Sequence, residues 1–175
     1  LSPEKRQKAL IEAMPHITDP KVRLVLVGGG PYEKDLRAVT KELGVENRVI
    51  FTGMQSSDSV ASLLKQADVF SLASYHFDNQ PMTFLEAASS GLPIVYCDEQ
   101  MTEGLTKKNA ILTDGIEGED FAKVFNELFA DPERLAALSK GALSVAKKFD
   151  SVTMAKKMVA LYDDLIRSHQ ALNME

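Results

Sequence analysis

Two carboxylates, Asp78 and Glu86, flank the start of an expected helix and are separated by seven residues. We expect this helix to run from Met82 to Ser90 and to be stopped by Gly91. The first backbone N–H groups of a helix have no partner inside it and carry the positive end of its dipole, which favours a diphosphate. Nearby carboxylates can accept hydrogen bonds from sugar hydroxyls. The segment therefore suits a sugar nucleotide as its ligand.

Both acids also have ordinary structural explanations. An acid in the first turn of a helix complements the helix dipole, which would account for Glu86. Asp78 followed by Asn79 is a common turn sequence. On spacing alone, the structural and the functional interpretations both stay open.

A glycine-rich loop, Gly28-Gly29-Gly30-Pro31, is a second candidate for contact with a phosphate group. It follows a short β-branched run and precedes a helix, as dinucleotide-binding turns do. The full fingerprint is absent, because Glu33 stands where the third glycine would be and no acid closes the next strand, which ends Ile50-Phe51-Thr52-Gly53. A tight strand-to-helix turn explains the loop equally well.

The histidines do not indicate a metal site or a hydrolase site. His76 lies in the loop that contains Asp78 but has no partner at metal-ligand spacing, so we interpret it as a solvated or turn-packing residue and predict no metal site. His16 and His169 are expected at the surface. No Ser-His-Asp, Cys-His or G-x-S-x-G arrangement occurs, so hydrolase chemistry has no support.

The elements that must position these residues alternate between helix and strand. Apolar spacing predicts helices at 5–14, 32–43, 58–67 and 82–90, the third capped by Ser57 or Asp58. A short β-branched run predicts a strand at 22–27, and further strands are expected at 48–52, 69–73, 94–97 and 110–112. The chain is then helical from about Glu119, with breaks at Asp131-Pro132 and at 149–151. The last helix, around 152–166, is interpreted as packing on the core.

This alternation predicts an α/β fold, with a Rossmann-like open parallel sheet covered by helices on both faces and a helical C-terminal region. Ligands of such sheets bind beyond the carboxyl ends of the strands. We therefore expect one crevice to be lined by the loops at 28–31, 52–54, 74–81 and 98–101, where the glycine and polar clusters lie.

Composition limits the classes of protein that fit. The 175 residues are 45% hydrophobic and 26% charged, which predicts a single domain with its own core. The net charge of −5, with scattered basic residues, argues against a nucleic-acid partner, and no apolar run approaches the roughly 20 residues of a membrane span. Cys97 is the single cysteine, which favours a cytosolic location and a core role. The start at Leu1, without methionine, indicates an excised piece.

Several motifs together carry a family resemblance. The segments G-G-G-P, I-F-T-G and F-L-E-A-A-S-S-G-L-P-I-V, with the paired acids, resemble the C-terminal nucleotide-sugar-binding domain of retaining glycosyltransferases of the GT-B fold, family 4. The resemblance covers nearly the whole chain, so residues 1–175 are expected to form this one domain, without the N-terminal acceptor domain and without the domain's first strand. It implies transfer of a hexose from a nucleotide-sugar, most simply UDP-glucose, with no metal cofactor. It also implies that the last helix can cross back to the partner domain, which would leave its apolar surface partly uncovered in residues 1–175.

The resemblance also implies roles for individual residues. Glu86 would hold the ribose of the donor and Asp78 would lie beside the sugar, although aspartate, one methylene shorter than the family's glutamate, reaches less far. Lys5 matches the end of a phosphate-binding stretch, Arg6 is a weaker candidate, and the family's arginine would precede Leu1. The backbone amides expected at the diphosphate are those of Met82, Thr83 and Phe84. Further donor contacts are expected at Gly29, Gly30, Phe51, Thr52, Gly53 and Asn79.

Other interpretations stay open at this point. The acceptor, such as a glycan, a lipid or a cell-envelope polymer, would be held by the N-terminal domain, so we expect residues 1–175 alone to turn over no donor. A sugar-nucleotide epimerase half and a non-catalytic nucleotide-binding regulatory module are the alternatives. A cytoplasmic location is expected, with peripheral association at the inner face of the membrane left open.

Overall fold

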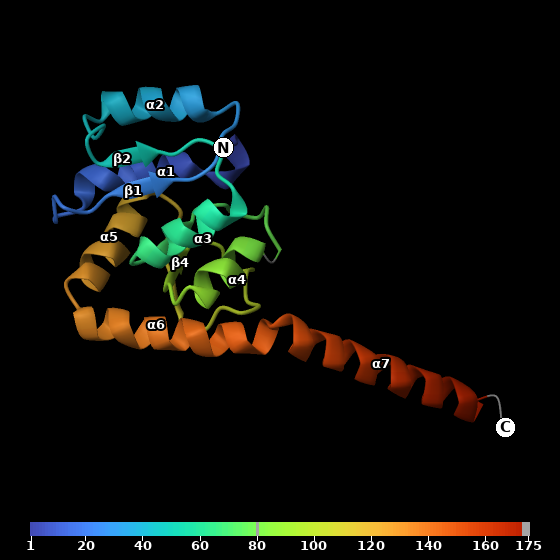
Figure 1. Cartoon of the computed structure of the whole chain (residues 1–175). Coiled ribbons are helices and arrows are strands. Elements are labelled where there is room, and N and C mark those ends of the chain that lie inside the picture. The colour runs from blue at the N-terminus through green and yellow to red at the C-terminus, as the bar shows by residue number, and fades with distance from the viewer. Residues whose placement is uncertain (80, 173–175) are drawn as a thin grey trace.

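The computed structural model describes residues 1–79 and 81–172 and contains the expected alternation of helices and strands (Figure 1). The strands are β1 (Leu24–Leu26), β2 (Val49–Phe51), β3 (Phe70–Leu72), β4 (Ile94–Tyr96) and β5 (Ala110–Leu112). The α-helices are α1 (Gln7–Ala13), α2 (Glu33–Glu42), α3 (Ser57–Gln66), α4 (Met82–Ser89), α5 (Gly118–Phe129), α6 (Pro132–Ala146) and α7 (Ser151–Leu172). Short 3₁₀ helices are η1 (Pro3–Lys5), η2 (Met14–His16) and η3 (Lys147–Phe149).

All five strands pair in parallel, which confirms the α/β class. They form two sheets, β1-β2 and β3-β4-β5, rather than one continuous sheet. In register, Leu24 lies opposite Val49 and Phe70 opposite Ile94. Among the described residues, β1 and β3 each have one edge with which no strand pairs, and the sheet is interrupted between these two edges.

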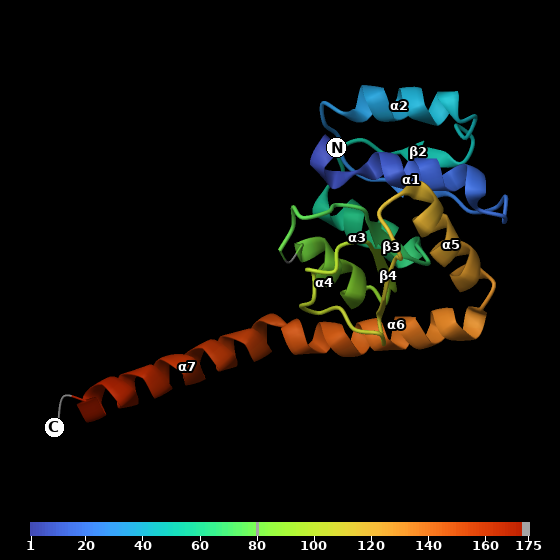
Figure 2. The ribbon, with the colours of Figure 1, turned by 180° about the vertical axis from the view of Figure 1, so that it is seen from behind.

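One hydrophobic core nevertheless joins the two sheets. Leu26 of β1 and Val95 of β4 belong to the same cluster, together with Ile11 of α1 and Phe121 of α5. Ile11 and Phe121 are fully buried, which contributes about 1.5–3 kcal/mol for each side chain. In both views α2 lies at one end of the molecule beside β1 and β2, while α6 runs along the opposite end (Figures 1 and 2).

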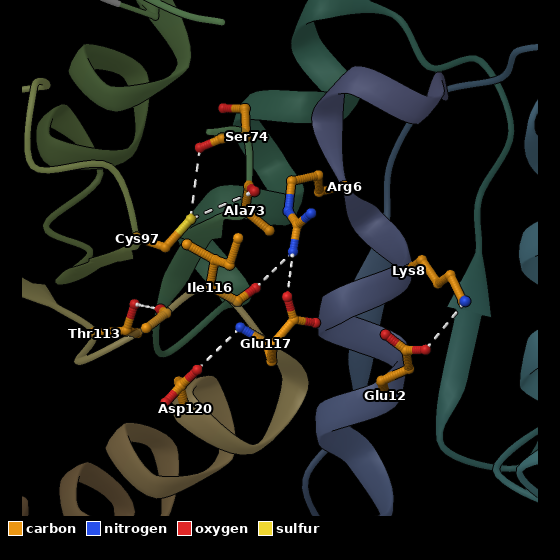
Figure 3. Close-up of polar contacts among 11 residues, drawn as sticks. Arg6, Lys8, Glu12, Ala73, Ser74, Cys97, Thr113, Ile116, Glu117 and Asp120 are labelled. Carbon is orange, nitrogen blue, oxygen red and sulfur yellow. Dashed lines mark hydrogen bonds and ion pairs between the residues drawn. The ribbon is translucent and has the colours of Figure 1, made fainter. Parts of the chain in front are cut away.

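The first predicted helix is divided at Arg6. This residue has a left-handed backbone (φ 50°), so η1 ends there and α1 begins after it. The Arg6 guanidinium donates through Nη2 to the carbonyl oxygen of Ile116 at 2.8 Å and lies 3.4 Å from Glu117 Oε1 (Figure 3). Glu117 is itself the N-cap of α5 and forms a capping box with Asp120. The turn that carries Lys5 is thus tied to the start of α5.

Two of the helix ends were predicted correctly from the sequence, and one helix cap was not. Gly44 after α2 adopts the expected left-handed conformation (φ 66°), and Asp131 before Pro132 caps α6 by accepting from the N–H of Arg134 at 2.9 Å. The predicted cap of α3 was wrong. Ser56, not Ser57 or Asp58, caps it, because the Ser56 hydroxyl accepts from the N–H of Ser59 at 3.2 Å.

The interpretation of the last helix as a core-packing helix was also wrong. After η3 the chain leaves the body, and α7 extends away from it in both views (Figures 1 and 2). Its apolar side chains are 43–61% exposed: Val152, Met154, Met158, Val159, Leu161, Tyr162, Leu165 and Ile166. Within residues 1–79 and 81–172, no helix combines the length and apolar character that crossing a membrane requires.

Cys97, just after β4, is the small core residue that was expected. Its thiol is buried and donates weakly to the carbonyl oxygens of Ala73, at 3.4 Å, and Ser74, at 3.6 Å (Figure 3). Burial raises the pKa of the Cys97 thiol to about 11, because the thiolate would lose its hydration. The thiol therefore stays protonated near neutral pH.

Gly141 allows α6 to approach the chain before β5. A Cβ at this position would overlap the backbone carbonyl of Lys108. We expect Gly141→Ala to lower the free energy of unfolding by about 1–3 kcal/mol, even though alanine favours an isolated helix by about 1 kcal/mol. Urea denaturation measures this, with Ser144→Ala on the exposed side of α6 as the control. Stabilisation by Gly141→Ala would show that the close approach is absent.

Candidate functional site

The loops that follow β1 and β2 are held together by backbone contacts. The N–H of Gly28 donates to the carbonyl oxygen of Gly53 at 3.0 Å, and the N–H of Gly29 faces Met54 Sδ at 3.3 Å. The amino group of Leu1 donates to the carbonyl oxygen of Gly29. A Cβ at Gly30 would meet the backbone of Leu1, so glycine is required there for close approach.

Lys5 and Asp78, both predicted site residues, lie in direct contact. Lys5 Nζ is 2.6 Å from Asp78 Oδ1, and it also sits over the ring of Phe77, 4.8 Å from the ring centre. The Lys5 side chain is 34% exposed and that of Asp78 only 14%. The structure thus brings together one cation and one carboxylate that are 73 positions apart in sequence.

The second oxygen of Asp78 is held as well. The hydroxyl of Ser74, which is fully buried at the end of β3, donates to Asp78 Oδ2 at 2.6 Å. A carboxylate offers about four acceptor positions, so these two contacts leave room for hydroxyl groups of a ligand. Asp78 can therefore orient Lys5 and accept further hydrogen bonds at the same time.

A polar pocket of about 360 Å³ opens beside this pair. One wall is the loop after β3, and the other is the loop after β4. The lining residues are His76, Phe77, Asp78, Asn79, Gln100, Thr102 and Glu103. Thr102 and Glu103 were not predicted, and Gln100 only as part of the loop at 98–101; their position after the carboxyl end of β4 was the available signal.

The start of α4 offers open backbone donors. Pro81 is its N-cap and provides no side-chain cap, and among the described residues no acceptor faces the N–H of Met82 or Thr83. The N–H of Phe84 already donates to the carbonyl oxygen of Pro81 at 3.0 Å, and its side chain is buried in the second core cluster. Met82 and Thr83 are thus the more accessible amides of the three predicted.

Glu86 lies on the exposed part of α4 but not in its first turn, which contains no acid. The explanation that Glu86 complements the helix dipole was therefore wrong, since that effect is confined to the first turn. Its carboxylate is available to a ligand.

The remaining predicted contacts lie at neighbouring carboxyl ends and do not line the pocket. Phe51 is stacked under the guanidinium of Arg37, 4.2 Å from its ring centre. The Thr52 hydroxyl donates to the carbonyl oxygen of Gly53 at 3.0 Å, and the Thr52 carbonyl accepts from Gln55 at 2.8 Å. With Gly29 and Gly30, these residues form a separate group at the end of the β1-β2 sheet.

The histidines lie as expected. His76 is a turn residue with a left-handed backbone (φ 52°), and its ring stacks on Tyr75 with 3.9 Å between centres. His16 and His169 are exposed. In the part of the chain that the structure describes, no three His, Cys, Asp or Glu side chains group as a metal site would need.

The chain is similar to proteins of known family. A family model described as "Glycosyl transferases group 1" matches residues 1–145. The GDP-mannose-dependent alpha-(1-6)-phosphatidylinositol monomannoside mannosyltransferase of Mycolicibacterium smegmatis is 30% identical over 151 residues, 79% of this chain and 39% of that protein. The alpha-monoglucosyldiacylglycerol synthase of Streptococcus pneumoniae is 30% identical over 160 residues, 90% of this chain and 33% of that protein.

The chain is also similar to a solved structure. The crystal structure of Anabaena HepE in complex with UDP-glucose matches with a TM-score of 0.83 and 28% identity, covering 94% of this chain and 46% of that one. The chain therefore spans between a third and a half of the length of the relatives that it matches.

Proposed function

The chain belongs to the glycosyl transferases group 1 family, and on this premise we propose that it is the donor-binding half of a retaining hexosyltransferase. The observation that carries the proposal is the Lys5–Asp78 pair, 2.6 Å apart at the edge of a polar pocket. The cation is Lys5 and the free N–H groups are those at the start of α4, whereas carboxylates and side-chain amides line the pocket. A nucleotide-sugar needs both, because it joins a diphosphate to a hydroxyl-rich ring.

Each part of the donor then has its own partners. Lys5 and the amides of Met82 and Thr83 face the diphosphate and stabilise the charge that develops on it when the sugar leaves. Glu86 accepts from the ribose hydroxyls, and Asp78 orients both Lys5 and the sugar. Arg6 stays the weaker candidate, since its Nη2 already donates to Ile116 and lies 3.4 Å from Glu117.

The donor is proposed to be a UDP-linked hexose such as UDP-glucose. Support comes from the similarity to Anabaena HepE, which was crystallised with UDP-glucose. A mannosyltransferase named for GDP-mannose is similar to the same degree, so the base is the point to test.

The acceptor is proposed to be bound by a further domain of the intact protein and to be a membrane lipid or a cell-envelope glycan. The names of two relatives contain lipids, phosphatidylinositol monomannoside and monoglucosyldiacylglycerol. A cytoplasmic protein that associates peripherally with the membrane fits such an acceptor.

We propose as well that a strand outside residues 1–175 lies between β1 and β3. In doubly wound sheets the first strand occupies the centre of the order 3-2-1-4-5-6, which is where the two sheets are separate here. Amide hydrogen exchange tests this: the amides of β1 and β3 should be better protected in the intact protein than in residues 1–175. Equal protection would contradict it.

The main test is calorimetric titration of the chain with UDP-glucose, UDP, GDP-mannose and GDP in metal-free buffer. We expect binding of the UDP series, tighter for UDP-glucose than for UDP. Preference for the GDP series would show that the base of the donor is guanine and not uracil. No binding of any of the four would overturn the proposal.

Two alternatives predict other results. A sugar-nucleotide epimerase would convert the donor itself, so the intact protein would release an epimerised nucleotide-sugar instead of a glycosylated acceptor. A regulatory module would bind the free nucleotide as tightly as the sugar-linked form, and Asp78→Ala would change neither affinity.

A further inference from the structure

Asp98 is a buried carboxylate that holds two loops together. It is the second residue after β4 and is only 1% exposed. Its Oδ2 accepts from the backbone N–H of His76 at 2.6 Å, and its Oδ1 accepts from the N–H of Gln100 at 3.0 Å. No lysine or arginine pairs with it among the described ion pairs, so backbone amides supply its hydrogen bonds.

One of the two amides that Asp98 binds belongs to a residue with an unfavourable backbone conformation. His76 has φ 52°, a left-handed conformation that costs a non-glycine residue roughly 1–2 kcal/mol. The hydrogen bond to Asp98 and the stacking on Tyr75 stabilise this turn. The turn sends the next two residues, Phe77 and Asp78, to their contacts with Lys5.

The same two loops form the two walls of the polar pocket. His76, Phe77, Asp78 and Asn79 lie on one wall, and Gln100, Thr102 and Glu103 on the other. Asp98 contacts the first residue of each set through the backbone. Its carboxylate therefore sets the position of one wall relative to the other.

The chemistry of this pocket fits a sugar better than a phosphate. Its lining contains the carboxylates of Asp78 and Glu103 and the amides of Asn79 and Gln100, which bind hydroxyl groups and repel further negative charge. The cation Lys5 is not among the lining residues; it contacts the pocket through Asp78, and the free N–H groups of α4 begin at Met82, three residues after Asn79 in the chain.

We propose that Asp98 is a positioning residue that sets the spacing of the two walls around the hexose of the donor. The inference rests on the proposed function and deepens it. Asp98 does not touch the substrate; it acts through the turn at His76 and through the loop that begins at Gln100.

Asp98→Asn tests the proposal, because the amide group of asparagine faces one of the two N–H donors in either orientation and leaves it without an acceptor. Titration with UDP-glucose and UDP should show that the ratio of their affinities falls by about tenfold, from the loss of one charge-assisted hydrogen bond. The affinity for UDP alone should fall much less than that for UDP-glucose, because among the proposed contacts of UDP only the one with Lys5 depends on the turn at His76. Asp114→Asn, an exposed aspartate paired with Lys123, is the matched control and should change neither affinity.

Repeating Asp98→Asn in a His76→Gly variant distinguishes an effect of Asp98 on the position of the loops from an effect on folding. Glycine adopts a left-handed backbone without strain, so in His76→Gly the turn depends less on Asp98. Asp98→Asn should then lower the ratio by only about threefold, and this background serves equally if the single variant does not fold. An unchanged ratio in Asp98→Asn, or an equal loss in both backgrounds, would overturn this inference alone. If the wild-type chain binds none of the four ligands, the proposed function fails and this inference fails with it.

Discussion

Replacing Lys5 with methionine is expected to lower kcat of the intact protein by about 100- to 1,000-fold, the usual effect of removing one group that stabilises charge developing in a transition state. Methionine keeps most of the aliphatic length of lysine, so the packing over Phe77 is largely retained while the ammonium is lost. KM for the donor should change less than kcat, because the charge on the leaving diphosphate grows as the sugar departs. Steady-state kinetics at varied donor concentration measures both.

Lys8→Met is the matched control for this prediction. Lys8 lies one turn along the chain, is about half exposed, and pairs with Glu12 at 3.3 Å on α1 (Figure 3). An exposed pair of this kind contributes little, so its loss should leave kcat unchanged. A comparable loss in both variants would show that general electrostatics, and not contact with the diphosphate, is responsible.

The Lys5–Asp78 contact adds a further expectation. In Lys5→Met the Asp78 carboxylate keeps Ser74 but loses its cation, so part of the effect could come through Asp78. The double variant Lys5→Met/Asp78→Asn distinguishes the two routes. If it is no slower than Lys5→Met alone, the two residues act as one unit.

Glu86→Ala is expected to weaken binding of the nucleotide itself by about 100-fold. Two charge-assisted hydrogen bonds from the ribose hydroxyls, at roughly 1.5 kcal/mol each, would amount to about 3 kcal/mol. UDP and UDP-glucose should lose affinity equally, which distinguishes Glu86 from Asp98. Calorimetry in metal-free buffer provides the measurement.

Glu46→Ala controls for the loss of one negative charge. Glu46 is exposed in the loop before β2, at the amino end of the strand, so it lies at the opposite edge of the sheet. Its removal should leave nucleotide affinity within about twofold. Unchanged binding in Glu86→Ala would remove this residue from the site.

Local signals were sufficient for most of the fold. The short apolar runs at β1 to β5, the stop at Gly44 and the break at Asp131-Pro132 each depend on a few neighbouring residues, and each was predicted correctly. The split of the sheet and the exposure of α7 could not be predicted in this way. Both depend on which partner lies beside an element, and periodicity does not report that.

The candidate site was likewise predicted only in part: its residues were identified from sequence, but their contacts were not. Asp78 and Lys5 were selected separately from sequence, through motif and resemblance, but their contact at 2.6 Å was not foreseen. Asp98 gave little signal, because its role depends on the left-handed backbone of His76 on another loop. The division of the first helix at Arg6 has a similar cause, since no local pattern predicts a non-glycine residue at φ 50°.

The burial of Cys97 makes the protein convenient for site-specific labelling. It is the single cysteine in the chain, its thiol is enclosed between Ala73 and Ser74, and its raised pKa leaves almost no thiolate at neutral pH. A fluorophore or spin label aimed at a cysteine introduced in place of the exposed Phe77 would therefore react there and not at Cys97. Such a probe would lie in the lining of the pocket and would report on a ligand that enters it. The native thiol would react only when the chain unfolds, so the rate at which Cys97 is labelled would measure global unfolding.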